Sequence, residues 1–314
     1  MRCYRVEPDP FPAPVREPLS AFAAVRTDCG QERPENQDRG VIADSRADQA
    51  WEPPAALSAH VDPSGGFFAL VCDGMGGELG GAIASSLALE VIVGAMRARW
   101  VQRSVEPAGS IALDETRIAH AMATSFEAAS ARIKQAGRDE PIYARMGTTA
   151  TLATVVHGTL LCAQVGDSRA YVIRGEQIAQ VTEDQTMAEL LRRTGGLAPD
   201  QIAAIVGPNV ILQALGSSTK LEVAFSRTPL AQGDIVLLCS DGLFGVVDDD
   251  EIAAEVRVEG AELATACDHL VALANERGGP DNITVAAFRV SGGGELPPPD
   301  TALAPVMLTP PFGR

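Results

Sequence analysis

Four aspartates of this sequence stand at the ends of predicted strands, where a carboxylate can act as a ligand. Asp73 follows the apolar run FFALVC and Asp241 follows IVLLCS, and each is followed at once by glycine. Asp167 closes LLCAQVGD, and Asp281 stands just before the predicted last strand in GGPDNITV. Glycines at such positions let backbone approach a ligand closely, so the pattern indicates an ion or phosphate site.

The joint occurrence of these carboxylates favours a cation. Any single Asp has an ordinary alternative as a turn residue. Four carboxylates gathered at one sheet rim, however, repel one another unless a cation lies between them. An all-oxygen ligand set suits magnesium, manganese or calcium and not zinc. All four histidines lie outside these motifs, and the six cysteines form no CxxC pair.

A nearby polar loop, QERPENQDRG, adds a cation and a further carboxylate. It carries Arg33 and, five residues later, Asp38. An arginine can hold a phosphate through two parallel hydrogen bonds. A lone arginine is also an ordinary solvated side chain, so this loop alone indicates little.

The elements that would position these residues come in blocks. Hydrophobic periodicity and β-branched runs predict strands at residues 21–27, 40–43, 67–72, 148–156, 160–165, 170–173, 177–181, 221–225, 235–239 and 283–290. Helical spacing predicts helices at residues 82–100, 114–135, 187–193, 199–206, 248–256 and 261–277. Blocks of strands and helices without βαβ alternation favour an α+β fold of antiparallel sheets with helices outside.

Composition divides the chain into one domain and two tails. Residues 1–20 are proline-rich and predict a loose N-terminal arm, and residues 291–314 are Gly- and Pro-rich and predict a disordered tail. The domain spans residues 21–290. Within it, residues 44–66 show no regular period and hold three prolines, which predicts a surface insertion. This insertion is either a partner-docking loop or, as we favour, an unselected loop.

The charge balance bounds the possible partners and compartment. A net charge of −16 over 314 residues argues against a nucleic-acid binder and a polybasic membrane surface. The cysteines at 72, 162 and 239 lie in apolar runs and read as buried hydrophobes in a reducing compartment. No apolar signal segment opens the chain, and no apolar run approaches the ~20 residues that cross a bilayer. We therefore expect a cytoplasmic protein with no membrane partner.

The ordered motifs resemble a known family. RPENQDR, FFALVCDGMGG, MGTTATLATVV, VGDSRAYVIRGEQIAQVTEDQT, LLCSDGLFGVV and GGPDNITV are similar to the metal-dependent Ser/Thr protein phosphatases of type 2C in their bacterial form. The resemblance covers roughly residues 21–290 in the family's order. It implies a four-layer α/β/β/α sandwich of two antiparallel sheets, with a centre of two or three Mn²⁺ or Mg²⁺ ions at one edge. The implied reaction is hydrolysis of phosphoserine and phosphothreonine in proteins.

The resemblance also implies a role for each matching metal-site residue. Asp73 would bridge two metal ions, and the carbonyl of Gly74 would bind one of them. Asp241 and Asp281 would ligate the other ion. Asp167 would help to bind a third, weaker ion.

Two further residues have implied roles in catalysis. Asp38 would hold metal-bound water, and Arg33 would hold the substrate phosphate. Two divalent ions can lower the pKa of a bridging water, so that hydroxide attacks phosphorus without a phosphoenzyme. Met75 stands where eukaryotic members often place a histidine proposed as general acid, and Met cannot donate a proton. Gln185 and Ala82 also depart from common family residues, a His and a Glu, although neither position is a metal ligand.

The same resemblance bounds the biology. Residues 186–214 correspond to the family's flap over the active site. The substrates would be phosphorylated proteins, the enzyme would oppose a Ser/Thr kinase, and we expect a monomer. One alternative is a non-catalytic pseudophosphatase that scaffolds a kinase complex. That alternative predicts that some carboxylate ligand positions no longer carry Asp, and every such position in this sequence does. Another, a phosphatase acting on a regulator of transcription or secretion, differs only in its substrate.

Overall fold

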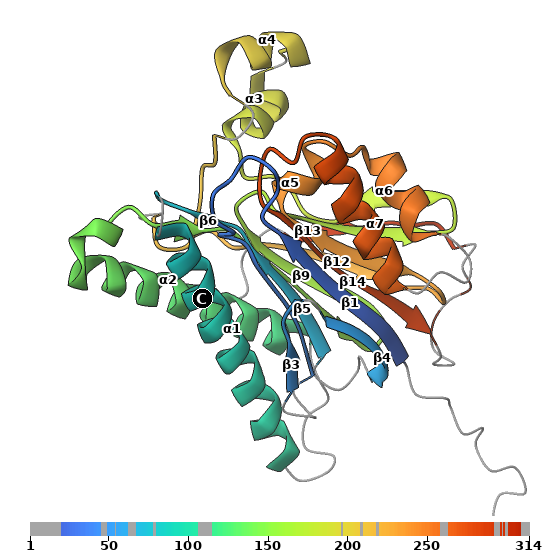
Figure 1. The fold of residues 1–314 in the computed structure, drawn as a ribbon. Coiled ribbons are helices and arrows are strands. Elements are labelled where there is room, and N and C mark those ends of the chain that lie inside the picture. Colours follow the sequence, from blue (N-terminus) through green and yellow to red (C-terminus); the bar gives the residue numbers. More distant parts are fainter. Residues whose placement is uncertain are drawn as a thin grey trace, which may run out of the picture.

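Two stacked antiparallel sheets form the centre of the protein (Figure 1). The computed structural model describes residues 20–44, 49–53, 55–61, 67–77, 80–105, 115–195, 197–207, 210–217, 220–257, 263–291, 296, 298 and 301–308. The predicted N-terminal arm lies outside the described residues, apart from its last residue.

The first sheet has six strands, and every neighbouring pair is antiparallel. Their order is β11 (Gln177–Gln180), β10 (Arg169–Arg174), β13 (Ile235–Cys239), β14 (Ile283–Ser291), β1 (Ser20–Asp28) and β4 (Ala55–Val61). The first and the last strand predicted within the domain lie side by side in this sheet, because β1 and β14 pair along their whole length.

The second sheet has seven strands, again antiparallel throughout. Their order is β15 (Val306–Leu308), β12 (Ala224–Pro229), β9 (Thr159–Val165), β8 (Ala150–Val156), β5 (Phe67–Cys72), β2 (Arg39–Asp44) and β3 (Gln49–Trp51). A small ribbon of β6 (Gly74–Met75) and β7 (Gly147–Thr148) continues from one end of this sheet.

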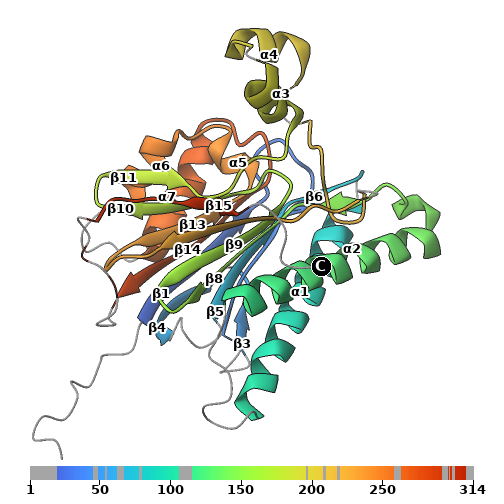
Figure 2. The same cartoon turned by 180° about the vertical axis from the view of Figure 1, so that it is seen from behind.

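Helices cover the outer face of each sheet (Figures 1 and 2). The second sheet carries α1 (Gly80–Val105) and α2 (Glu115–Asp139), with a short 3₁₀ helix η2 (Pro141–Tyr143). The first sheet carries α5 (Asp241–Phe244), α6 (Asp249–Val256) and α7 (Leu263–Glu276). Two further helices, α3 (Met187–Gly195) and α4 (Pro199–Ile205), project from one end of the sandwich (Figure 2).

Three hydrophobic cores fill the spaces between these layers. Successive residues of a strand face opposite sides of its sheet, so Phe68 of β5 packs toward α1 and α2, while Phe67 packs between the sheets. There the ring of Phe67 meets Phe288 edge-to-face with centroids 5.0 Å apart. The third core joins the first sheet to α5, α6 and α7. The predicted four-layer α/β/β/α sandwich is confirmed.

Helix α1 is a core helix of unusual hydropathy. Its window Gly80–Arg99 is long and apolar enough to cross a membrane, and among the described residues it is the one such helix. The expectation that no apolar run approaches the length needed to cross a bilayer is therefore wrong for the length and composition of this helix. Ala84, Ala88 and Ile92 of this helix are fully buried in the core beneath the second sheet. A sheet-facing apolar side accounts for the hydropathy.

The predicted surface insertion at residues 44–66 contains two strands. β3 pairs with β2, and β4 pairs with β1 through a register shift, so each strand lies at the edge of one of the sheets. The expectation of an irregular loop is wrong at these two places. Both strands are held by backbone hydrogen bonds to a neighbouring strand, and such bonds do not require an apolar sequence pattern.

The tail after residue 290 is also more ordered than its composition predicts. β15 adds an antiparallel edge strand to β12, and Leu296 and Leu303 pack against the core between the sheets. The predicted disorder is therefore wrong for residues 301–308. Backbone hydrogen bonds to β12 hold β15, and such bonds require no apolar alternation. The strand predicted at residues 221–225 starts later, at Ala224, and continues to Pro229.

A buried ion pair anchors this tail. Arg174 and Asp234 are almost inaccessible, with side chains 3% and 0% exposed, and their charged groups lie 2.6 Å apart. Arg174 also donates to the carbonyl oxygens of Pro229, Thr301 and Ala302. The pair therefore neutralises a buried charge and holds the tail against the sandwich.

We expect Asp234→Ala to lower the free energy of unfolding by about 3–5 kcal/mol, because it leaves Arg174 charged and buried without its partner. Urea denaturation measures the change. The double variant Arg174→Met/Asp234→Leu is the control, since replacing both charges by apolar groups is often close to neutral. A single variant that unfolds at the wild-type urea concentration would contradict the role given to the pair.

Candidate active site

The ends of β2 and β5 bring two of the predicted site residues together. Arg39 lies opposite Cys72 where these antiparallel strands pair. Asp38 precedes the first of these residues and Asp73 follows the second, so both leave the second sheet at the same rim. This placement follows from strand register alone.

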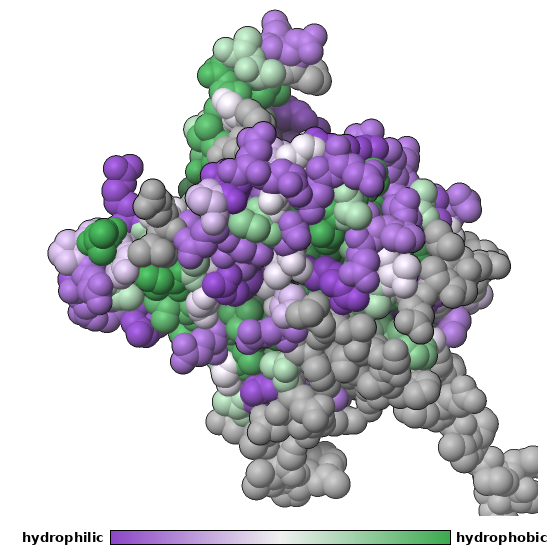
Figure 3. Space-filling model, in the orientation of Figure 1, coloured by the Kyte–Doolittle hydropathy of each residue, from purple (hydrophilic) through white to green (hydrophobic). Residues whose placement is uncertain are grey.

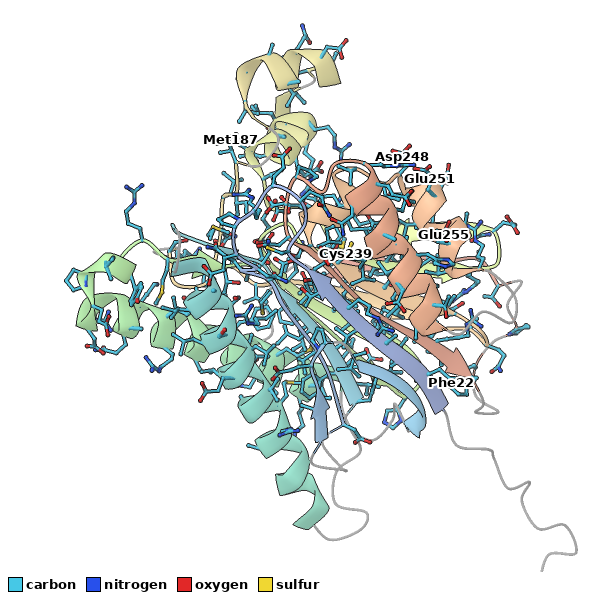
Figure 4. The ribbon with its side chains drawn as sticks, in the orientation of Figure 1. Phe22, Met187, Cys239, Asp248, Glu251 and Glu255 are labelled. Atoms are coloured by element: carbon cyan, nitrogen blue, oxygen red, sulfur yellow. The ribbon has the colours of Figure 1, made fainter. Side chains whose placement is uncertain are left out.

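The first sheet supplies two more carboxylates at the same end of the sandwich. Cys239 pairs with Val285 between β13 and β14, which brings Asp241, two residues after the first, close to Asp281. Figure 4 shows Cys239 beneath α5, at the end of the sandwich opposite Phe22. The strand ends that the sequence singled out therefore do converge.

The carboxylates affect one another's protonation. Burial, together with the charges of Asp241 and Asp281, raises the pKa of Asp38 to about 7. Burial and Asp241 raise the pKa of Asp167 to about 7. Desolvation and the charge of Asp281 raise the pKa of Asp241 to about 6. For Asp73, desolvation and four neighbouring carboxylates raise the pKa well above its usual range. All five aspartates thus share one electrostatic site.

Three carboxylate oxygens in this site lack a partner among the described residues. The Oδ1 atoms of Asp38, Asp167 and Asp241 are buried and make no hydrogen bond. A buried carboxylate oxygen without a donor is costly unless a cation satisfies it. Hard divalent cations take such oxygen ligands, so the residues present fit a metal centre.

The same carboxylates do not close around one point in this arrangement. Within the part of the chain that the structure describes, no three His, Cys, Asp or Glu side chains are grouped tightly enough to hold an ion. One of them is engaged elsewhere, because Asp281 Oδ2 accepts a hydrogen bond from Arg33 Nη2 at 2.6 Å. The carboxylates are therefore gathered at one rim, with Asp281 held by Arg33, while the Oδ1 atoms of Asp38, Asp167 and Asp241 have no partner among the described residues.

Backbone contacts fix the position of Asp73. Its carbonyl oxygen accepts hydrogen bonds from Thr149 N and Thr148 Oγ1, both at 2.8 Å, and its own N–H donates to Thr149 Oγ1 at 2.9 Å. Thr149 Oγ1 also lies 2.7 Å from the hydroxyl of Ser168, the residue after Asp167. Sequence reasoning missed these three hydroxyl residues. The polar pair in MGTTATL, inside an otherwise apolar run, was the available signal.

The backbone next to Asp73 is tightly packed. A Cβ at Gly74 would lie 2.2 Å from the carbonyl oxygen of Gly81 and 2.7 Å from that of Gln37. Only glycine lets the start of α1, the Asp38 loop and the Asp73 segment approach so closely. This close approach explains the glycine that follows the strand-ending aspartate.

Asn282 and Ser240 hold the Asp38 loop in place. Ser240 Oγ donates to Asp38 Oδ2 at 2.6 Å. Asn282 Oδ1 accepts from Gln37 N at 2.8 Å, and its Nδ2 donates to the carbonyl of Glu35 at 2.9 Å. Neither residue was predicted, although each stands next to a predicted aspartate in the sequence. Their partners lie more than 200 positions away, which no local pattern reveals.

Arg33 lies at the mouth of the site. Its side chain is 54% exposed, and it forms the ion pair with Asp281. The hydrogen bond and charge of Asp281, with Asp241 and Asp73 nearby, raise the pKa of Arg33 further. The guanidinium is therefore charged and reachable from solvent, beside the carboxylates.

A cavity of about 830 Å³ joins this site to the projecting helices. One side is lined by Arg33, Asp167, Asp241 and Asp281, and the other by residues of α3 and α4 that include Glu189, Arg192 and Ile202. Within the segment predicted as a flap, residues 186–214, α3 and α4 thus contribute residues to the cavity that the carboxylates also line. Figure 3 shows it as a protrusion with green, apolar side chains on one flank; Leu190 and Ile205 are among its exposed apolar residues.

A two-sheet sandwich flanked by helices, with a carboxylate cluster at one rim, is an arrangement suited to metal-dependent hydrolysis. The family model described as "Protein phosphatase 2C" matches residues 55–274. The chain belongs to the protein phosphatase 2C family.

Several relatives support this assignment. The protein phosphatase PhpP of Streptococcus pneumoniae is 32% identical over 263 residues, which are 84% of this chain and 95% of the relative. The serine/threonine phosphatase stp of Listeria monocytogenes is 29% identical, over 84% of this chain and 93% of its own length.

Solved structures agree with the fold. The Mycobacterium tuberculosis serine/threonine phosphatase PstP/Ppp superposes with a TM-score of 0.68 at 27% identity, over 87% of this chain and 99% of that one. A second PstP structure, of the catalytic domain in complex with two manganese ions, gives a TM-score of 0.66 at 27% identity over the same shares.

These findings confirm the resemblance stated from the motifs. The protein is a metal-dependent Ser/Thr protein phosphatase that acts on phosphoproteins. The catalytic interpretation is supported over the pseudophosphatase alternative.

Proposed function

We propose that the carboxylate cluster at this rim is the catalytic metal centre and that it holds two, or with Asp167 three, Mn²⁺ or Mg²⁺ ions. The observation that carries the proposal is the set of three buried carboxylate oxygens without partners. The proposed ligands are Asp73, Gly74 through its carbonyl, Asp241, Asp281, Asp167 and, through water, Asp38.

Bound divalent cations would lower the pKa of a water molecule and neutralise charge on the transferring phosphoryl group. The chain's own residues set up this chemistry. Ser240 orients the Asp38 carboxylate by donating to Oδ2, which leaves Oδ1 free to accept from water. Gly74 allows the Asp73 backbone to sit against the Asp38 loop. The two acidic loops therefore hold a fixed spacing before any substrate binds.

Arg33 would bind the substrate phosphate. Its guanidinium is exposed and lines the same cavity as the carboxylates. A phosphate entering the cavity would compete with Asp281 for this group, which releases Asp281 as a ligand. Met75 cannot donate a proton to the leaving serine or threonine oxygen, and no histidine is among the described residues that line the cavity. Water at the site would then supply that proton.

The substrates we propose are proteins that a cytoplasmic Ser/Thr kinase has phosphorylated, with the enzyme acting as a monomer. The names of the relatives support phosphoserine and phosphothreonine as the targets. The net charge of −16 favours basic or neutral surroundings of the phosphorylated residue over strongly acidic ones.

One experiment tests both the function and the role of Arg33. We expect the purified protein with Mn²⁺ to hydrolyse a phosphothreonine peptide and p-nitrophenyl phosphate. Arg33→Ala should lower kcat/KM by about 10- to 100-fold, mostly through a higher KM, because a charge-assisted hydrogen bond contributes about 1.5–3 kcal/mol.

Arg192→Ala is the matched control, since Arg192 lines the same cavity but pairs with Glu189 and is 64% exposed. It should stay within about twofold of the wild type, as expected for an exposed pair. If neither substrate is hydrolysed at any Mn²⁺ or Mg²⁺ concentration, the proposed function fails. An unchanged KM in Arg33→Ala would remove only the phosphate-binding role.

A further inference from the structure

Gln185 lies where three separate segments of the chain meet, at the foot of the flap. It uses each of its hydrogen-bonding groups. Its N–H donates to the Gly166 carbonyl at 3.0 Å, and its carbonyl accepts from Leu212 N at 2.8 Å. Its side-chain Oε1 accepts from Gly166 N at 2.8 Å, and its Nε2 donates to the carbonyl of Glu222 at 3.2 Å. No role was predicted for this residue beyond its departure from a common histidine.

The reciprocal pair of bonds fixes the turn that carries Asp167. Both backbone polar groups of Gly166 bond to Gln185. Gly166 has φ +101°, and a Cβ there would lie 2.6 Å from the Thr149 side chain, so the turn is held on its other side as well. Asp167, the next residue, is buried, lines the cavity and has a free Oδ1. The direction of its carboxylate therefore depends on Gln185.

The same residue belongs to the stem of the flap. The two chains of the stem pair through Met187 N to the Val210 carbonyl at 2.8 Å and through Leu212 N to the Gln185 carbonyl. Thr186 and Ile211 bridge between them. Figure 4 shows Met187 at the base of the flap. Gln185 is thus bonded both to the stem that carries α3 and α4 and to Gly166, so a movement of these helices can displace Gly166 through this one residue.

From these contacts we propose that Gln185 is a positioning residue that sets the Asp167 carboxylate and couples cation binding at Asp167 to the flap stem. The inference rests on the proposed role of Asp167 as a metal ligand. A cation held by Asp167 would stabilise the turn, the turn would stabilise Gln185, and the paired stem would become more ordered. Gln185 acts through Asp167 and touches no reacting atom.

The chain offers a matched control for this proposal. Gln213 bonds the same neighbour, accepting from Glu222 N at 2.8 Å and donating to its carbonyl at 3.4 Å, but no bond joins its side chain to Gly166. Gln185→Met and Gln213→Met therefore make the same change in side-chain chemistry. Both lose a contact with Glu222, and only the first also loses the side-chain bond to Gly166 N, while the backbone bond from Gln185 N–H to the Gly166 carbonyl remains.

Calorimetric titration with Mn²⁺ is the first measurement, with Asp167→Ala as the reference for loss of the weakest site. We expect Gln185→Met to weaken that site by about 10- to 100-fold, the usual effect of removing a group that orients a ligand. Gln213→Met should stay within twofold of the wild type. Wild-type affinity at every site in Gln185→Met overturns the proposal.

Hydrogen exchange is the second measurement, and it does not depend on turnover. The Gly166 amide should exchange faster in Gln185→Met than in Gln213→Met. Saturating Mn²⁺ should slow exchange in the stem residues 210–217 of the wild type but not of Gln185→Met. Stem protection that persists in Gln185→Met would overturn the coupling.

A conservative variant keeps the test decisive if Gln185→Met does not fold. Gln185→Glu keeps an acceptor for the Gly166 N–H and loses the donor to Glu222, so it should bind Mn²⁺ at least as tightly as the wild type; weaker binding would contradict the proposal. If Asp167→Ala itself binds Mn²⁺ like the wild type, the role of Asp167 and this inference fail together. Peptide hydrolysis by the same proteins tests the phosphatase function separately, since that function depends on Asp73 and Asp241.

Discussion

Asp73→Asn is expected to lower phosphatase turnover by at least about a thousandfold while the protein stays folded. Loss of one group that stabilises transition-state charge already costs about 10²–10³ in rate. Asp73 is proposed to contact two ions, and Asn in its place removes the one negative charge that both ions would share. Asp241→Asn should abolish activity in the same way.

Steady-state hydrolysis of a phosphothreonine peptide over a range of Mn²⁺ concentrations measures this loss. Asp250→Asn is the control, because Asp250 is exposed on α6 and apart from the carboxylate cluster. It should retain wild-type kcat. Near-normal turnover in Asp73→Asn or Asp241→Asn would contradict our assignment of the metal site. Circular dichroism of each variant checks first that the protein is folded.

The convergence of these aspartates could be predicted from sequence because strand ends determine where they lie. An apolar run such as FFALVC can only be a buried strand or a buried helix segment, and the glycine after Asp73 marks where it stops. Once the strands are antiparallel neighbours, register brings Asp38 to Asp73 and Asp241 to Asp281. A sequence pattern local to each strand thus predicted that aspartates far apart in the sequence lie close together in the fold.

The residues that hold these aspartates could not be predicted in the same way. Thr149 bonds Asp73 across 76 positions, and Asn282 bonds Gln37 across 245. Neither residue type is unusual where it stands, because Thr is common in strands and Asn is common in turns. Only the assembled fold shows which polar side chains satisfy which loop.

The missed elements have a related cause. β4 and β15 are edge strands, held by backbone bonds to β1 and β12, and α5 has only four residues. Periodicity needs a segment several residues long to be recognised, and β15 and α5, with three and four residues, are too short to show one. Arg174, whose hydrogen bonds to Thr301 and Ala302 hold the tail, likewise reads in sequence as an ordinary strand-end arginine.

Stability of the metal-free protein is expected to fall as pH rises from about 4 to about 7. Burial raises the pKa of Asp38 and of Asp167 from 3.8 to about 7, and desolvation raises that of Asp241 to about 6. In the unfolded chain these groups ionise near their usual value. A carboxyl whose folded pKa is raised stabilises the fold below its unfolded pKa, and this contribution is lost as pH rises through the folded pKa.

The expected size is on the order of 4 kcal/mol for Asp167, since each tenfold change in proton affinity corresponds to about 1.4 kcal/mol. Glu251 has the opposite sign, because Arg277 lowers its pKa to about 2. The stabilisation from Glu251 grows as the pH rises from about 2 to 4.5, which is the usual pKa of this group. Most of this change therefore lies below the range from pH 4 to 7.

Urea denaturation at a series of pH values in the presence of a chelator measures this dependence. Mn²⁺ should reverse the loss above pH 7, because a ligand that binds only the folded state stabilises it by RT ln(1 + [L]/Kd), about 2.7 kcal/mol at a hundredfold excess over Kd. Asp241→Asn should show a flatter pH profile and a smaller response to Mn²⁺. A metal-free stability that stays level or rises between pH 5 and 7.5 would mean that the carboxylates are not crowded and buried together as described. Desolvation, with mutual repulsion added to it, weakens the metal-free fold once these carboxylates ionise, and a bound cation would offset both effects. A variant of the cluster that flattens the pH dependence should therefore also respond less to Mn²⁺.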